Sequence, residues 1–102
     1  MNYTLGVHFE WDDAKSEACL AERGFDFAYA TKAFFDPHRL IEPDRRRDYG
    51  EERYRLLGCI GLRLFVVVYT WRLNAIRIIS ARKANQREIK RYGNRAHPGP
   101  PR

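Results

Sequence analysis

The sequence predicts an α+β domain with two helices near its start, an antiparallel sheet of three to four strands, and a basic helix near its end. Residues 64–68 (LFVVV) form an unbroken apolar run rich in valine, which is typical of an inner strand covered on both faces. Residues 76–81 form a second apolar stretch after a short polar connection, and the two stretches together indicate an antiparallel hairpin. Apolar residues recur at helical spacing in residues 13–34, which predicts two helices packed on the sheet.

Length and composition favour one domain. The chain has 102 residues, of which 44% are hydrophobic, enough for one compact core. We expect this domain to span residues 1–95 and a Pro/Gly-rich tail, residues 96–102, to be disordered.

Cys19 and Cys59 lie far apart without CxxC spacing, and no apolar run approaches the roughly 20 residues of a membrane span. We therefore expect a soluble, cytoplasmic protein with reduced thiols.

The chain is basic, with a formal net charge of +6 and a pI near 9.7. The excess lies late in the sequence, because from Arg72 onward nine Lys or Arg residues accompany a single acid, Glu88. A basic C-terminal third favours a polyanionic partner such as nucleic acid, or an acidic protein segment. A solvated helix face is the alternative interpretation of the same charges.

Capping residues predict the bounds of the first two helices. Asp12 is a good N-cap for a helix over residues 13–23, and Gly24 is placed to end it. Asp26 is a second N-cap, and the helix that it begins should stop before Pro37. Both helices should cover the same face of the sheet.

Three further segments are predicted to be extended. Residues 7–11 alternate in polarity, as in an edge strand or an extended lead-in to the first helix. Residues 39–41 favour a short strand, followed by a polar loop over residues 42–50. Residues 51–60 alternate a basic set of side chains with an aromatic and aliphatic set, which indicates a strand with one core face.

A basic helix is predicted to follow the hairpin. Asn85 and Glu88 match the pattern in which the first and fourth residues cap each other's backbone N–H. Ile89 and Tyr92 then supply the narrow apolar side of this helix.

Several short blocks follow one another in order between residues 9 and 92. They are Phe9-Glu10-Trp11-Asp12 with Lys15, Phe35-Asp36-Pro37, Gly50-Glu51-Glu52-Arg53, Val67-Val68-Tyr69-Thr70, and Ile76-Arg77-Ile78-Ile79-Ser80-Ala81-Arg82-Lys83-Ala84 with Glu88 and Tyr92. In these blocks the chain resembles the BrnT family of bacterial toxins. The resemblance implies a type II toxin with a RelE-like fold and ribonuclease activity, which inhibits translation until a BrnA-type ribbon-helix-helix antitoxin neutralises it.

The chain departs from this family pattern at two places. It has Cys19 where the family usually has Asn, and Glu22-Arg23-Gly24 where the family usually has Lys-His-Gly. Arginine does not exchange protons near neutral pH, so Arg23 cannot replace a histidine that shuttles protons. It can replace one that binds phosphate or neutralises a helix end.

Attack of a ribose 2′-OH on the adjacent phosphate needs a base, an acid and positive charge, but no metal ion. Arg77, Arg82 and Lys83, at the exit of the second hairpin strand, suit the stabilisation of charge on the phosphorane. Strand alternation places Arg77 and Lys83 on one face and Arg82 on the other, unless the strand end twists. The alternative is that these side chains only solvate a strand end.

Residue type alone does not settle the general base. The candidates are Glu52 and Tyr92, with Glu10, His8 and His38 as alternatives. No cluster of Asp, Glu and His has the spacing of metal ligands, so we predict neither a metal ion nor another cofactor.

Two classes of function are compatible with these residues. The first is a metal-independent endoribonuclease toxin that binds RNA and assembles with its antitoxin, and the second is a catalytically silent basic module that binds nucleic acid or an antitoxin. Tyr69 and Trp71 either stack on bases or belong to the core. The cations expected to bind RNA are Lys15, Arg53, Arg55 and Arg72.

Overall fold

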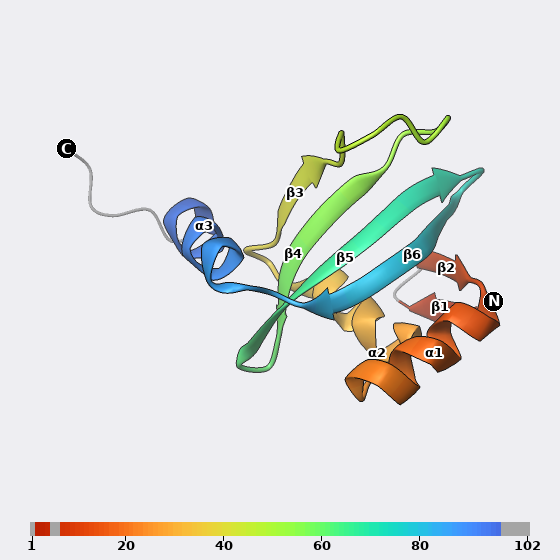
Figure 1. The fold of residues 1–102 in the computed structure, drawn as a ribbon, viewed down its shortest axis with the longest axis horizontal. Coiled ribbons are helices and arrows are strands. Elements are labelled where there is room, and N and C mark those ends of the chain that lie inside the picture. The colour runs from red at the N-terminus through yellow and green to blue at the C-terminus, as the bar shows by residue number, and fades with distance from the viewer. Residues whose placement is uncertain (1, 5–6, 97–102) are drawn as a thin grey trace.

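The structure, a computed structural model, describes residues 2–4 and 7–96, with side chains described for residues 7–94. Its elements in chain order are β1 (Asn2–Thr4), β2 (Val7–Trp11), α1 (Asp13–Arg23), α2 (Phe27–Ala30), the 3-10 helix η1 (Thr31–Phe35), β3 (Leu40–Pro43), β4 (Tyr54–Ile60), β5 (Arg63–Arg72), β6 (Ala75–Lys83) and α3 (Gln86–Ala96). The six strands form one sheet in the order β1-β2-β6-β5-β4-β3 (Figure 1). The tail predicted from residue 96 lies, apart from Ala96, outside the described residues.

The α+β class is confirmed, but the predicted sheet of three to four antiparallel strands is wrong in size and in strand direction. β2 and β6 run parallel, with His8 opposite Ala75, and the other neighbouring strands are antiparallel. β2 is therefore an inner strand, and β1 lies outside it at the edge. Alternation indicates that residues 7–11 are extended, but it carries no information about a pairing partner so distant in sequence.

α1 begins and ends as its capping residues predict. The Asp12 carboxylate accepts a hydrogen bond from the Lys15 amide at 3.1 Å, and Gly24 ends the helix in the left-handed conformation with φ 85°. The second helix begins where predicted, but it is a single α-turn, α2, continued by η1. η1 packs so closely on β4 that a side chain at Gly58 would collide with the Ala33 carbonyl oxygen.

The apolar run in β5 is covered on both faces, as predicted. Phe65 and Val67 pack against the helices that follow β2, and we call this side of the sheet the helix face. Leu64 and Val66 point to the opposite side, which we call the open face. There they pack with Tyr92, because α3 covers one end of the open face.

α3 is held at its start and along one side. Asn85 and Glu88 cap each other's backbone at 2.9 Å each, as the capping pattern predicts. Tyr92 donates a hydrogen bond to the Asp36 carboxylate at 2.6 Å, which links α3 to the end of η1. α3 meets the sheet along its Tyr92 side, and Ile89 is 43% exposed. None of the described helices is long and apolar enough to cross a membrane.

A β-bulge in β6 interrupts its pairing with β5. Val68 lies opposite Ser80, while the next residue, Tyr69, lies opposite Ile78. Ile79 therefore has no partner in β5. Side chains alternate between faces with a period of two, so one extra residue moves every later side chain of β6 to the other face.

The bulge decides where the cations of β6 point. Arg77 pairs with Thr70 and Arg82 pairs with Val66, so both arginines lie on the open face. Lys83 lies on the helix face. The prediction that Arg77 shares a face with Lys83 is therefore wrong, because it assumed an uninterrupted strand.

Candidate functional site

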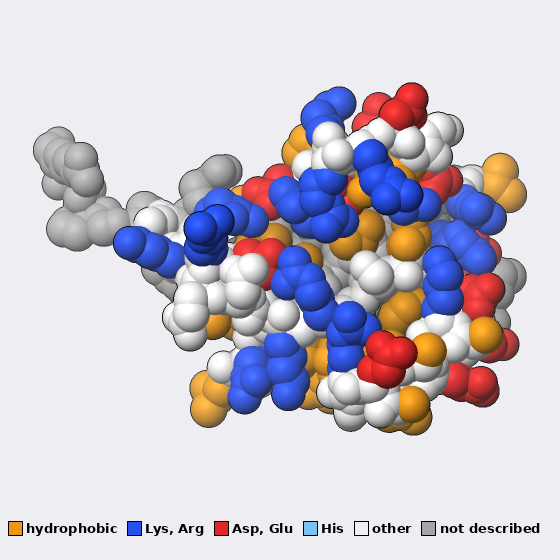
Figure 2. All heavy atoms as spheres, in the orientation of Figure 1, with side chains coloured by type: hydrophobic (Ala, Val, Ile, Leu, Met, Phe, Trp, Pro, Cys, Tyr) orange, Lys and Arg blue, Asp and Glu red, His pale blue; other side chains and the backbone are white. Residues whose placement is uncertain are grey.

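Figure 2 shows Lys and Arg side chains gathered over strands β4 to β6 and beside α3, with acidic side chains between them. Much of this charge is paired. Six arginines of the open face and the loop that borders it form ion pairs: Arg46 with Asp44 (2.7 Å), Arg53 with Glu51 (3.0 Å), Arg55 and Arg91 with Glu42 (3.2 and 2.7 Å), Arg82 with Glu88 (2.7 Å) and Arg77 with Glu10 (4.0 Å). These carboxylates offset most of the positive charge of the set.

The pair between Arg82 and Glu88 is structural. Two guanidinium nitrogens bind the carboxylate, at 2.7 and 2.8 Å, and Glu88 is 6% exposed. The hydrogen bonds from Arg82 outweigh the effect of burial and lower the pKa of Glu88 below its ordinary value. The pair fastens the start of α3 to the end of β6, and the catalytic role expected for Arg82 stays a prediction beside this structural one.

Arg77 and Glu10 form the loosest ion pair of the open face. They are register partners on β6 and β2, and the distance from Nη1 to Oε1 is 4.0 Å. Their side chains are 28% and 24% exposed. A separation of 4.0 Å is too long for a hydrogen bond, so either group can bind a substrate without breaking a strong contact.

A cavity of about 550 Å³ includes Glu10 in its wall and lies at the tip of the β5–β6 hairpin. His8 and Glu10 are two residues apart on β2, so their side chains lie on the same face. We call the cavity at the hairpin tip the hairpin cavity. It brings together residues that the sequence offers for separate roles, namely two acid–base candidates and an RNA-binding cation. Its lining consists of His8, Glu10, Arg72, Leu73, Asn74 and Ala75.

Tyr92 lies in the core beneath α3, away from the hairpin cavity. Burial and the hydrogen bond to Asp36 raise the pKa of Tyr92, so the phenol stays protonated at neutral pH. Asp36 also accepts hydrogen bonds from the amides of Cys59 at 2.7 Å and His38 at 2.8 Å. Burial alone would raise the pKa of Asp36, but these three hydrogen bonds lower it overall. Tyr92 is thus placed as a hydrogen-bond donor to a structural carboxylate.

The remaining acid–base candidates and one binding candidate are spread over several elements. Glu52 is exposed in the loop before β4, and its carbonyl oxygen accepts a hydrogen bond from the Thr70 hydroxyl. Thr70 is the register partner of Arg77, so Glu52 lies near the open-face arginines. His38 is exposed after η1, and Lys15 is exposed on α1 beside a separate hollow.

The two aromatic residues considered for base stacking differ in their surroundings. Tyr69 is 4% exposed and packs in the core of the helix face, where burial raises its pKa. Trp71 is 54% exposed near the end of β5. Of the two, the structure places Tyr69 in the core and leaves only Trp71 open to a base.

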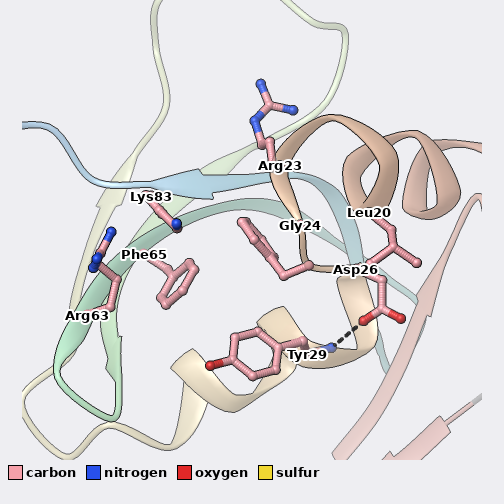
Figure 3. A pocket seen from close by; sticks show the side chains of 9 residues that line it. Leu20, Arg23, Gly24, Asp26, Tyr29, Arg63, Phe65 and Lys83 are labelled. Atoms are coloured by element: carbon pink, nitrogen blue, oxygen red, sulfur yellow. Dashed lines mark hydrogen bonds between the residues drawn. The ribbon is translucent and has the colours of Figure 1, made fainter.

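A second cavity, of about 490 Å³, lies on the helix face (Figure 3). We call it the aromatic cavity. Of its lining residues, the sequence offers only Arg23 and Lys83 as candidate functional residues. The reason is that the cavity forms between a helix end and strand ends that are distant along the chain. The one local indication of this cavity is the spacing of Arg63 and Phe65, which lie two residues apart and so share one face of a strand. Its lining includes the cations Arg23, Arg63 and Lys83 and the rings of Phe25, Tyr29 and Phe65.

The fold and the hairpin cavity define a class of protein. It is a small α+β domain that presents a carboxylate, an imidazole and arginines together on a sheet face, and these groups suit acid–base chemistry on a phosphodiester. In the part of the chain that the structure describes, no group of three or more His, Cys, Asp or Glu side chains is arranged to hold a metal ion.

Comparison with known families makes the class specific. Residues 11–88 match the family model described as ribonuclease toxin, BrnT, of type II toxin-antitoxin system. The match covers more than half of the 102 residues, so the chain belongs to the BrnT family of ribonuclease toxins, which act with an antitoxin partner. No curated protein matches the chain. The resemblance seen in the sequence is confirmed, with the β6 cations inside the matched segment and His8 and Glu10 just before it.

Proposed function

We propose that this toxin cleaves RNA in the hairpin cavity without a metal ion. Glu10 takes the proton of a ribose 2′-OH, whose oxygen bonds to the adjacent phosphorus while the bond from phosphorus to the 5′ oxygen breaks. His8, when protonated, gives a proton to the leaving 5′ oxygen, and Arg77 stabilises the charge on the phosphorane. The products are a 2′,3′-cyclic phosphate and a free 5′-OH.

The observation that carries this proposal is the loose pair between Arg77 and Glu10, of which Glu10 lines the cavity. The other ion pairs of the open face span 2.7 to 3.2 Å, whereas this one spans 4.0 Å. Neither group has to give up a hydrogen bond to the other when it turns towards a phosphodiester bound beside the pair. The carboxylate then lies beside the nucleophile, and the guanidinium lies beside the phosphate oxygens.

The other arginines of the open face extend the proposed site along the RNA. The β5 partners of Arg77 and Arg82 are four residues apart, which corresponds to about 13 Å along a strand. Arg82 therefore contacts a neighbouring phosphate and not the one that reacts. Arg72 contacts a further phosphate, and Arg53 and Arg55 do so after partial release from Glu51 and Glu42.

The cellular role in this proposal follows the family. The chain acts in the cytoplasm, where cleavage of messenger RNA inhibits translation. A BrnA-type ribbon-helix-helix antitoxin neutralises it by forming an oligomer with it. Membership of a toxin-antitoxin family supports this assignment, because an uninhibited ribonuclease would harm its own host.

Purified protein incubated with end-labelled RNA tests the reaction. We expect cleavage that persists in EDTA and leaves 2′,3′-cyclic phosphate ends. Glu10→Gln keeps the side-chain size but removes the base, so the cleavage rate should fall by about a hundredfold or more. Glu17→Gln, which changes an exposed carboxylate on α1, is the matched control and should cut at the parent rate.

Three results would count against the proposal. Loss of cleavage in EDTA would contradict the metal-independent reaction. A Glu10→Gln variant that cuts at the parent rate would remove Glu10 from the chemistry, and Glu52→Gln would then test the other carboxylate. RNA that is bound but never cut would favour the catalytically silent binding module.

A further inference from the structure

The aromatic cavity lies on the opposite face of the sheet from the proposed cleavage site and at the other end of the β5–β6 hairpin. Lys83 is the register partner of Phe65, and Arg63 lies two residues before Phe65 on the same face. Arg63 and Lys83 are thus diagonal neighbours on adjacent strands. Figure 3 shows both cations beside the ring of Phe65, with Tyr29 across the cavity and the Arg23 guanidinium pointing away from the rings.

Arg63 and Lys83 differ from the six ion-paired arginines of the open face and its bordering loop in having no partner. Among the described side chains, neither cation has a hydrogen bond or an ion pair. The one carboxylate in the lining, Asp26, accepts a hydrogen bond from the Tyr29 amide at 2.9 Å and caps α2. Arg23 lies 3.8 Å from Glu22 and offsets the negative end of α1. Arg63 and Lys83 are therefore the cations of the lining that can hold an anion without competition from a nearby carboxylate.

The floor of the cavity is aromatic. The rings of Phe25 and Phe65 meet edge to face at 5.0 Å, and those of Tyr29 and Phe65 meet edge to face at 5.9 Å. Phe25 and Phe65 are almost fully buried, whereas Tyr29 is 37% exposed. A ligand in this cavity therefore meets chiefly the Tyr29 ring, next to two unpaired positive charges.

We propose that the aromatic cavity binds one nucleotide of a single-stranded nucleic acid, with its phosphate between Arg63 and Lys83 and its base against the aromatic floor. This deepens the proposed function, on which it rests, by adding a binding site away from the scissile bond. Nucleotides match the cavity because each unit carries both an anion and a flat apolar ring. An acidic peptide would use the two cations but would leave the rings without a matching partner.

The binding test uses an uncleavable ligand. A 2′-O-methyl RNA tetranucleotide lacks the 2′-OH nucleophile, so its affinity can be measured by titration with the intact protein. The double variant Arg63→Ala/Lys83→Ala should bind about tenfold or more weakly, and Tyr29→Ala should weaken binding by a similar factor. The double variant Arg87→Ala/Lys90→Ala removes the same charge from exposed positions of α3 and should bind like the parent.

Competition experiments identify the ligand. One competitor is a DNA tetranucleotide of the same sequence. If it competes equally, the cavity binds the phosphate and the base and not the sugar. Inorganic phosphate that competes as well as the oligonucleotide, or a glutamate-rich peptide that binds in place of both oligonucleotides, would overturn the proposal. Unchanged affinity in Arg63→Ala/Lys83→Ala would overturn it too, provided that the melting temperature confirms a folded protein.

The binding site and the cleavage site can fail separately. If Glu10→Gln still cuts RNA while Arg63→Ala/Lys83→Ala loses affinity for the uncleavable ligand, the proposed chemistry is wrong and the nucleotide site stands. If Glu10→Gln loses cleavage and the double variant keeps its affinity, the nucleotide site is wrong and the cleavage site stands.

Discussion

The open face and the aromatic cavity use the same kind of side chain in different ways. On the open face and its bordering loop six arginines pair with carboxylates, and Arg55 and Arg91 share one, that of Glu42, at 3.2 and 2.7 Å. In the aromatic cavity Arg63 and Lys83 have no carboxylate partner among the described side chains and lie beside aromatic rings. The net charge calculated from the sequence does not distinguish paired cations from unpaired ones. An anion, however, binds an unpaired cation without the cost of breaking an existing ion pair.

The difference separates structural cations from binding cations. The tight pairs of the open face hold α3 and the loop before β4 in place, so their loss should reduce stability. The loose pair between Glu10 and Arg77 is intermediate, because the two charges lie close together but no hydrogen bond holds them. The unpaired cations of the aromatic cavity should affect binding and leave stability almost unchanged.

The largest effect expected from this comparison is kinetic. Glu10→Gln should lower kcat for RNA cleavage by about a hundredfold or more, because it removes the proposed base. Arg63→Ala/Lys83→Ala should instead raise KM, because it weakens binding away from the scissile bond. Steady-state rates over a range of RNA concentrations separate the two effects. A double variant whose kcat falls as far as that of Glu10→Gln would place the reaction in the aromatic cavity.

Arg82 and Lys83 are neighbours in sequence on opposite faces, so they give a matched pair for stability. Arg82→Ala leaves the buried Glu88 carboxylate without its guanidinium, and we expect a loss of about 2 kcal/mol. Lys83→Ala removes an exposed, unpaired cation and should cost about 0.5 kcal/mol or less. Urea unfolding of both variants, with Arg87→Ala as the exposed control, measures the difference. Equal losses at the two positions would remove the distinction between structural and binding cations.

Acid should weaken the paired region. Hydrogen bonds from Arg46 lower the pKa of Asp44 to about 2, from an ordinary value of 3.8. The folded value is the lower one, so the ionised carboxylate stabilises the fold above about pH 4, and this contribution disappears as the pH falls towards about 2. Asp44→Asn should cost about 1.5 kcal/mol at pH 7 and flatten the loss of stability in acid. Unfolding free energies between pH 7 and pH 2 check this, with Glu17→Gln as the control.

The smallest expected effect is on salt dependence. Binding of single-stranded nucleic acid weakens with salt, and each phosphate contact contributes about 0.7 to the slope of log K against log salt. Removing Arg63 and Lys83 together should reduce this slope by about 0.7, for one phosphate. Affinities for the uncleavable oligonucleotide at several salt concentrations provide the slope. A slope identical to that of the parent would mean that these cations do not contact a phosphate.

The sequence by itself determined the features that depend on neighbouring residues. The bounds of α1 follow from Asp12 and Gly24, the start of α3 follows from Asn85 and Glu88, and the inner strand follows from its apolar run. Each of these signals acts within about one helical turn or along one strand, so it is present in the local order of residues. The family blocks are likewise local patterns repeated in order.

The tertiary structure alone decided which of these elements meet. β2 joins β6 across more than sixty residues of chain, with His8 opposite Ala75, and this pairing builds the hairpin cavity from candidates that the sequence names but does not group. One unpaired residue, Ile79, moves Arg82 and Lys83 to the faces opposite to those that alternation predicts. The physical reason is that strand pairing and bulges are set by packing between distant segments. A single-residue shift there reverses the direction of every later side chain in the strand.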